Sequence, residues 1–204
     1  VQARTGSGKT GAFGIPIVAD TDPELAAPQA LVLAPTRELA NQSATEIRIL
    51  GKHRGVRCLP IYGGVGYTAQ LEGLKEGTHV IVGTPGRILD HLGSGRMSFE
   101  NVKTVIFDEA DELLSLGFWP DMKEIRSYLP GKRQSCLFSA TLPNRVLALA
   151  LQGGSLAGVA LTALDTLIVL GLKGKNFRQL EAIVLGLILT IGLCYFVELA
   201  LIRP

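Results

Sequence analysis

The chain of 204 residues is poor in the residues that build disulfide and histidine metal sites. Its three cysteines, Cys58, Cys136 and Cys194, are scattered without a paired spacing, which excludes a disulfide framework and is typical of reduced thiols in a cytosolic protein. Its three histidines also lack ligand spacing, so no histidine metal centre is expected. A formal net charge of +2 excludes a strongly basic domain.

Charged residues become scarce after residue 150. Residues 1–150 carry 16 Lys and Arg and 15 Asp and Glu residues, whereas residues 151–204 carry only four and three. Two apolar runs, 154–172 and 182–202, are each close to the roughly 20 residues that cross a bilayer as a helix, and they lack the polar stripe of a core helix. We expect a hydrophobic two-helix hairpin with transmembrane helices; a buried helical hairpin is the alternative.

A glycine-rich stretch near the start of the chain, Ala3 to Thr10, is suited to hold the phosphates of a nucleotide. Gly6 and Gly8 let backbone N–H groups turn toward one anion, while Lys9 adds a charge and the Thr10 hydroxyl reaches the metal. The strict pattern has a glycine where Ala3 stands, so the match is to its looser form. A strand-to-helix turn that binds nothing is the alternative.

An acidic motif, Asp108-Glu-Ala-Asp111, follows the short apolar run Lys103 to Phe107, which is typical of a buried parallel strand. Asp108 therefore lies at the carboxyl end of a strand, where α/β sheets bind ligands. We assign Asp108 to the metal and Glu109 to the attacking water. Alone, this motif could be a helix start that favours acids; with the phosphate loop it predicts a nucleoside triphosphatase.

Four further segments complete an order of motifs that resembles the DEAD-box RNA helicases. Each follows a strand-like run, so all are expected at one rim of a sheet. They are Pro35-Thr-Arg-Glu-Leu-Ala40, Gly63-Gly64, Thr84-Pro-Gly-Arg87 and Ser139-Ala-Thr141. The resemblance covers residues 1–148 and implies an α/β fold, a RecA-like P-loop domain with a mostly parallel sheet between helices, which acts on ATP, Mg²⁺ and RNA.

The resemblance also implies a role for each motif residue. Lys9, Asp108 and Glu109 would be catalytic, and Thr10 with Asp108 would hold Mg²⁺. ATP would be bound by Thr5, Gly6, Ser7, Gly8, Lys9 and Thr10. Asp111, Ser139 and Thr141 would couple the ATP site to the RNA site. The backbone of an RNA single strand or short duplex would be held by Pro35, Thr36, Arg37, Gly64, Thr84, Pro85, Gly86 and Arg87.

The tail of the chain, about 153–204, resembles two consecutive spans of the Nramp divalent-metal transporters. The metal-binding signatures of that family, Asp-Pro-Gly-Asn and Met-Pro-His, are absent, so no transport site is assigned. The loop between the two runs is basic and would stay cytoplasmic, which would place the helicase part on the other side of a membrane. This conflict predicts a chimera, with a junction at 149–153.

The resemblance also sets an expectation for activity. The chain begins inside the first strand of the domain and ends before a second RecA-like domain, which in the family supplies arginines to the transition state. We expect weak nucleotide binding, negligible turnover and no unwinding, with the helicase part in the cytoplasm and the tail possible at a membrane. Two alternatives stay open: a divalent-metal transporter fragment with an appended soluble domain, and a generic P-loop ATPase without RNA.

Overall fold

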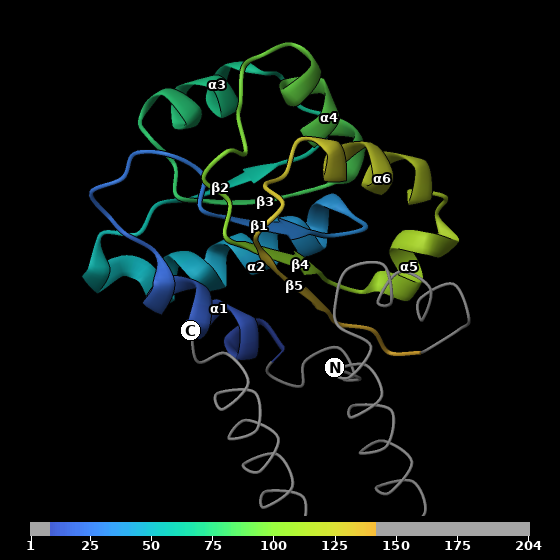
Figure 1. Cartoon of the computed structure of the whole chain (residues 1–204), viewed down its shortest axis with the longest axis horizontal. Helices are drawn as coiled ribbons and strands as arrows, with labels where there is room; N and C mark the ends of the chain where they lie inside the picture. The colour runs from blue at the N-terminus through green and yellow to red at the C-terminus, as the bar shows by residue number, and fades with distance from the viewer. Residues whose placement is uncertain (1–8, 142–204) are drawn as a thin grey trace, which may run out of the picture. The chain divides into compact units, whose positions relative to one another are not determined.

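The computed structural model describes residues 9–141 of the chain (Figure 1). The chain divides into two units, Val1–Gly153 and Gly154–Pro204, and all described residues lie in the first. The predictions on Thr5 to Gly8, on the junction and on the two-helix hairpin fall outside these residues. Within the described part of the chain, no helix is long and apolar enough to span a membrane.

Five parallel strands form the central sheet, in the order β2-β3-β1-β4-β5. The strands are β1 (Ala30–Leu33), β2 (Cys58–Ile61), β3 (Val80–Gly83), β4 (Thr104–Phe107) and β5 (Gln134–Leu137). Both β1 and β3 are buried along their whole length, because helices cover both faces of the sheet and leave no position for an alternating polar side chain. The predicted α/β fold with a parallel sheet between helices is confirmed.

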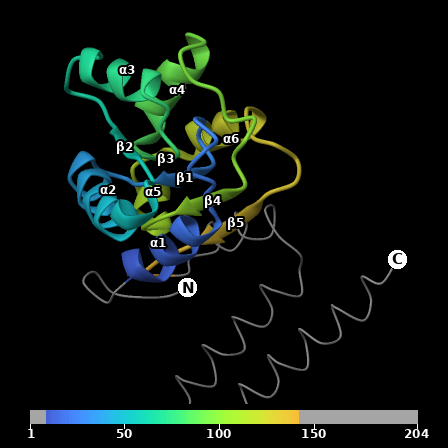
Figure 2. The ribbon, with the colours of Figure 1, turned by 90° about the vertical axis from the view of Figure 1, so that its left-hand side faces the viewer.

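The helices cover the two faces of the sheet and create a hydrophobic core on each (Figures 1 and 2). The first core packs β-strand side chains against α1 (Lys9–Asp20) and α2 (Arg37–Gly51). The second packs them against α4 (Pro85–Gly93), α5 (Ala110–Ser115) and α6 (Trp119–Ser127). A 3₁₀ turn, η1 (Lys52–Arg54), follows α2, and α3 (Thr68–Lys75) precedes β3.

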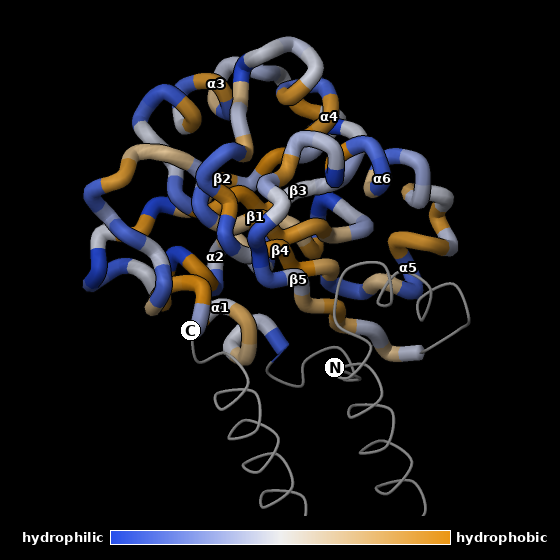
Figure 3. Tube along the Cα trace, viewed as in Figure 1, coloured by the Kyte–Doolittle hydropathy of each residue, from blue (hydrophilic) through white to orange (hydrophobic). Residues whose placement is uncertain are grey.

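Side chains of β1 alternate between the two cores. Val32 belongs to the core under α1 and α2, whereas Leu31 and Leu33 belong to the core under α4 to α6, because successive strand residues point to opposite faces. Figure 3 shows hydrophobic residues along the strands at the centre and also on the helices around them. This double burial fixes the position of each strand end, and therefore of the loops that follow.

Gly83 allows β2 and β3 to lie unusually close at the end of the strands. It is paired with Ile61, and a Cβ atom at residue 83 would lie 2.1 Å from the Ile61 carbonyl oxygen. No side chain fits in that space, so the glycine is required by the sheet itself. The next residue, Thr84, begins one of the predicted RNA-binding segments.

Candidate functional site

The predicted site segments lie together because every strand of the sheet is parallel. Apart from the phosphate loop, each follows the carboxyl end of a different described strand, and these ends share one edge of the sheet. A row of backbone hydrogen bonds connects neighbouring segments along this edge. The donor and acceptor pairs are Phe138 N to Phe107 O at 2.8 Å, Asp108 N to Leu33 O at 2.9 Å, Ala34 N to Gly83 O at 2.9 Å, and Thr84 N to Ile61 O at 3.0 Å.

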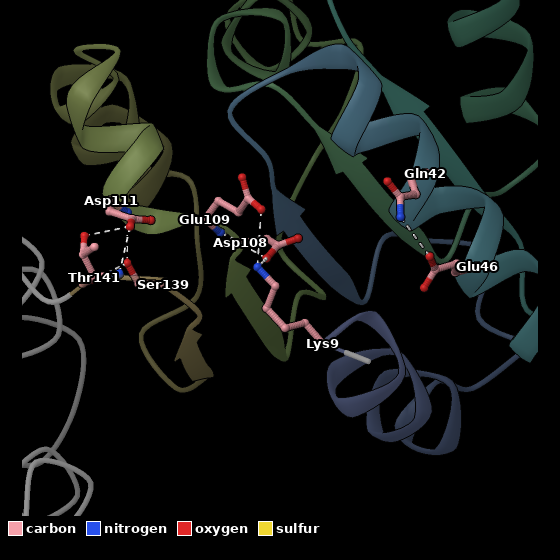
Figure 4. Close-up of polar contacts among 8 residues, drawn as sticks. All are labelled: Lys9, Gln42, Glu46, Asp108, Glu109, Asp111, Ser139 and Thr141. Atoms are coloured by element: carbon pink, nitrogen blue, oxygen red, sulfur yellow. Dashed lines mark hydrogen bonds and ion pairs between the residues drawn. The ribbon is translucent and has the colours of Figure 1, made fainter. Parts of the chain in front are cut away.

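Lys9, at the start of α1, meets the two acids that follow β4 (Figure 4). Its Nζ atom lies 3.4 Å from Glu109 Oε1 and 3.9 Å from Asp108 Oδ1. The Lys9 and Asp108 side chains are buried, with exposed fractions of 8% and 7%. One ammonium therefore pairs with two carboxylates, which leaves net negative charge at a largely desolvated position.

Asp108 has the environment of a cation ligand. Burial raises its pKa above the ordinary value, and neighbouring Glu109 adds to the rise, while Lys9 opposes it. Within residues 9–141, its side chain accepts one hydrogen bond, from the Glu109 N–H, 3.1 Å from Oδ1. A buried carboxylate with so little compensation is stabilised by a divalent cation, and carboxylate and hydroxyl oxygens are the ligands that Mg²⁺ prefers. Asp108 and the half-buried Thr10 fit that ion.

Glu109 occupies a strained backbone conformation. Its φ of 49° and ψ of 55° lie in the left-handed region, and no other non-glycine residue among those described has a positive φ. Such a conformation costs about 1–3 kcal/mol and persists only where the surroundings enforce it. The next residue, Ala110, donates its N–H to the Phe138 carbonyl oxygen at 2.9 Å. The turn directs the Glu109 carboxylate back toward Lys9 (Figure 4).

Asp111 joins the segment after β4 to the segment after β5. Its Oδ2 atom accepts hydrogen bonds from the Thr141 N–H at 2.9 Å and the Thr141 hydroxyl at 2.8 Å. The Asp111 N–H donates to Ser139 Oγ at 3.2 Å, and that hydroxyl donates to the Thr141 carbonyl oxygen at 2.6 Å. Partial burial alone would raise the pKa of Asp111, but these hydrogen bonds outweigh it and lower the pKa. The structure thus brings the three predicted coupling residues into contact (Figure 4).

The predicted RNA-binding residues after β1 and β2 lie next to each other. Thr36 caps α2 by accepting the Leu39 N–H at 3.3 Å, and Pro35 before it is buried. Arg37 is exposed and pairs with Glu38 at 2.5 Å. Gly64 has a φ of 79° and is so close to Arg37 that a Cβ atom at residue 64 would lie 3.9 Å from Arg37 Nη1.

The predicted segment after β3 forms the first turn of α4, and its arginine points into the protein. Thr84 is the N-cap and Pro85 the first residue of the helix, followed by the half-buried Gly86. Arg87 is only 9% exposed. Its Nη2 atom donates to the Val65 carbonyl oxygen at 2.8 Å, and its Nε atom lies 3.8 Å from Asp90 Oδ2. In this conformation Arg87 binds the loop after β2.

A third acid, which the motifs did not indicate, acts on Asp108. Glu46, on α2, repels negative charge at Asp108 and contributes to its raised pKa, and it accepts a hydrogen bond from Gln42 Nε2 at 3.3 Å (Figure 4). The spacing of four residues between Gln42 and Glu46 places both on one face of α2. The spacing can be read from the sequence, but the sequence does not indicate that this face of α2 is turned toward Asp108.

Comparison with known proteins agrees with this arrangement. The family model described as DEAD/DEAH box helicase matches residues 1–149, which is more than half of the chain. The chain belongs to the DEAD/DEAH box helicase family. Its RecA-like α/β fold is that of a DEAD box protein from the hyperthermophile Methanococcus jannaschii, with a TM-score of 0.71 and 43% identity over 74% of this chain and 41% of that one.

Curated DEAD-box relatives are longer than this chain. It is 52% identical over 149 residues to the DEAD-box ATP-dependent RNA helicase CshA of Geobacillus kaustophilus, covering 73% of this chain and 32% of the relative. It is 49% identical over 145 residues to the ATP-dependent RNA helicase DeaD of Escherichia coli, covering 71% and 23%. The matched part thus spans a third or less of these two relatives.

The tail is similar to a different family. A model described as natural resistance-associated macrophage protein-like matches residues 145–204, so the two family matches overlap at 145–149. These residues lie outside the described part of the chain. The transmembrane helices and the chimera therefore stay predictions.

Proposed function

We propose that the DEAD-box part of this chain is the ATP- and Mg²⁺-binding part of an enzyme that hydrolyses ATP in response to RNA. The observation that carries this proposal is the meeting of Lys9, Asp108 and Glu109 at the carboxyl edge of the parallel sheet. Phosphoryl transfer requires a cation for the phosphates, a metal ligand and a group that orients water. Lys9 supplies the cation, Asp108 the metal ligand and Glu109 the group that orients water. Both carboxylates lie within hydrogen-bonding or ion-pairing distance of the Lys9 ammonium.

Each residue has a task that its surroundings support. The Lys9 ammonium would exchange its two carboxylate neighbours for phosphate oxygens. Asp108 and Thr10 would hold Mg²⁺, which neutralises phosphate charge when bound. The Glu109 carboxylate would orient the attacking water and receive its proton. The hydrogen-bonded group of Asp111, Ser139 and Thr141 would relay changes between the ATP and RNA sites.

RNA is favoured over a nucleotide-only function by the neighbouring segments of the same edge. Arg37 and Gly64 lie together, and the first turn of α4 begins at Thr84, after the strand that lies between theirs in the sheet. Helix N-termini and arginines bind phosphate oxygens without reading bases. Failure of the chain to bind single-stranded RNA, with ATP binding intact, would favour a generic P-loop ATPase instead.

Substitution of Lys9 tests the nucleotide site directly. We expect Lys9→Ala to weaken the binding of radiolabelled ATP and Mg²⁺ by about tenfold or more, because a charge-assisted hydrogen bond contributes roughly 1.5–3 kcal/mol. Lys75→Ala, at an exposed position on α3, is the matched control and should bind ATP as the parent chain does. Equilibrium dialysis on the full chain measures both. Equal ATP affinity for Lys9→Ala and the parent would rule out this site.

A second function is supported for the tail alone. Residues 145–204 match the Nramp-like family model, and the apolar runs 154–172 and 182–202 have the length of membrane spans. We propose that these runs anchor the chain in a membrane and that the two parts meet at 149–153. No transport activity is proposed, because the metal-binding signatures are absent from the sequence.

A further inference from the structure

Tyr67 is held between two arginines at the end of the loop that follows β2. The Arg87 guanidinium carbon lies 3.9 Å from the centroid of the Tyr67 ring, and that of Arg96 lies 5.1 Å from it. The Tyr67 hydroxyl donates to Asp90 Oδ2 at 3.2 Å. This single side chain therefore connects the loop to α4 and to the turn after α4.

Two buried hydrogen bonds of Gln70 also connect the segment after β2 to α4. Gln70 Nε2, on α3, donates to the Tyr62 carbonyl oxygen at 3.0 Å. Its amide oxygen therefore faces His91, whose Nε2 atom lies 2.9 Å away and must carry the proton. The ring of His91 also meets the edge of the Tyr67 ring, with centroids 5.4 Å apart. Gln70 and His91 are 4% and 0% exposed, so water does not replace these bonds.

The loop itself, Gly63 to Tyr67, has little support of its own. A Cβ atom at Gly63 or Gly66 would have no heavy atom within 4 Å, and Gly64 has a positive φ. Glycine residues lose more conformational freedom than other residues when the backbone is fixed in one geometry. The loop is fixed through the Arg87 bond to Val65 O at 2.8 Å and the contacts of Tyr67.

We infer that Tyr67 and Gln70 are positioning residues, which hold the Gly63–Tyr67 loop on α4 and so preform the RNA-backbone site between Gly64 and the first turn of α4. This inference rests on the proposed function in RNA binding. Neither side chain needs to touch RNA. Their contacts fix the loop before RNA arrives, so that its ordering no longer subtracts from the binding free energy.

RNA affinity of the full chain tests this role. The probe is a fluorescein-labelled oligouridylate of about 12 nucleotides, and fluorescence anisotropy follows its binding as protein is added. Tyr67→Leu should weaken RNA binding by about fivefold to tenfold, since it removes the ring between the two arginines. Tyr67→Phe keeps that ring and should bind RNA within about twofold of the parent. Gln70→Glu, which cannot donate to Tyr62 O, should also weaken RNA binding.

The matched control is Tyr128→Leu. Tyr128 is 40% exposed and Tyr67 is 37% exposed, but Tyr128 lies after α6 and away from the loop. This control and all three variants should bind ATP as the parent does, which separates positioning of the RNA loop from general damage to the domain.

Three outcomes would count against the inference in different ways. Parent-like RNA affinity in Tyr67→Leu would overturn the positioning role and leave the RNA function standing. Equal losses of ATP and RNA affinity in Tyr67→Leu, with no rescue by Tyr67→Phe, would show a structural role only. A parent chain that fails to bind the oligouridylate would overturn the proposed RNA function and the inference with it.

Discussion

His91 is a buried histidine that the fold keeps neutral. Its ring is fully buried, and within the described part of the chain its Nδ1 atom has no hydrogen-bond partner. Burial lowers the pKa of His91 below the ordinary value of 6.5, and the neighbouring charges of Arg87 and Arg96 lower it further, while Asp90 acts in the opposite direction. The aromatic ring that faces it belongs to Tyr67.

This pKa makes the stability of the domain depend on pH. The unfolded chain protonates His91 near pH 6.5 and the folded chain resists it, so acidification below that value favours unfolding. The pKa of His79, lowered first by burial and then by Arg57, acts in the same direction. We expect the free energy of unfolding, measured in urea, to fall as the pH is lowered from about 8 to about 5.5.

The variant His91→Gln isolates the contribution of this side chain. It cannot titrate, so its free energy of unfolding should fall less steeply over the same pH range, whatever its absolute stability. Parallel pH profiles for the parent and His91→Gln would contradict the assignment of the effect to His91.

At the same scale, residue types could be predicted but backbone conformations could not. The motif Asp108 to Asp111 identified the acids correctly as neighbours at a strand end, because the preceding apolar run defines the strand. Nothing in those residues indicated that Glu109 would adopt a left-handed conformation. The N–H of the next residue is bound by the Phe138 carbonyl oxygen, a contact between segments far apart in sequence that the motif does not reveal. Arg87 similarly turned inward because of Tyr67 and Val65.

The strands were the most predictable elements. Short apolar runs before each motif predicted strands near the observed β1 to β5, since buried parallel strands require apolar side chains on both faces. Which strands are neighbours did not follow from the runs, because pairing depends on contacts between distant segments. The close approach of β3 to β2 at Gly83 is one such contact.

Two glycine substitutions test whether β2 and β3 lie as close together at Gly83 as described. Gly83→Ala should destabilise the domain by about 2 kcal/mol or more, because its Cβ atom would meet the backbone of Ile61 and the strands would have to separate. Gly93→Ala, in α4, places its Cβ atom in open space and should be neutral or stabilising by up to about 1 kcal/mol. Urea unfolding of the two variants measures the difference. Equal stability would mean that β2 and β3 are not packed as described.

The whole molecule combines a DEAD-box part with an apolar tail, and the two parts differ in charge density, in hydropathy and in the family that they match. Motif order predicted the family of the first part and the sheet edge at which the motifs gather, because the motifs are specific and each of those after residue 30 follows a strand. For the tail, hydropathy predicts a location in a membrane but indicates no ligand or reaction. The described residues, 9–141, do not include it.

Membrane fractionation tests the tail at this scale. We expect the full chain to sediment with membranes and to resist a carbonate wash. The double variant Leu164→Arg and Leu193→Arg, with one charge in each apolar run, should be largely soluble, since an arginine near the centre of a span costs about 2.5 kcal/mol or more. Asn176→Arg with Gln179→Arg adds the same charge to the loop and should stay with the membranes. A soluble parent chain would refute the anchor.

The row of backbone hydrogen bonds from Phe138 to Ile61 restricts how ATP and RNA can influence each other. The row crosses all five strands at the edge where both ligands are proposed to bind, and both cores hold the strands from either side. Bending or shearing the sheet would break several of these bonds at once. On the proposed function, a signal between the two ligands would be carried by the segments above the edge, such as Asp111 with Thr141, because the hydrogen-bonded edge fixes the spacing of the two proposed sites.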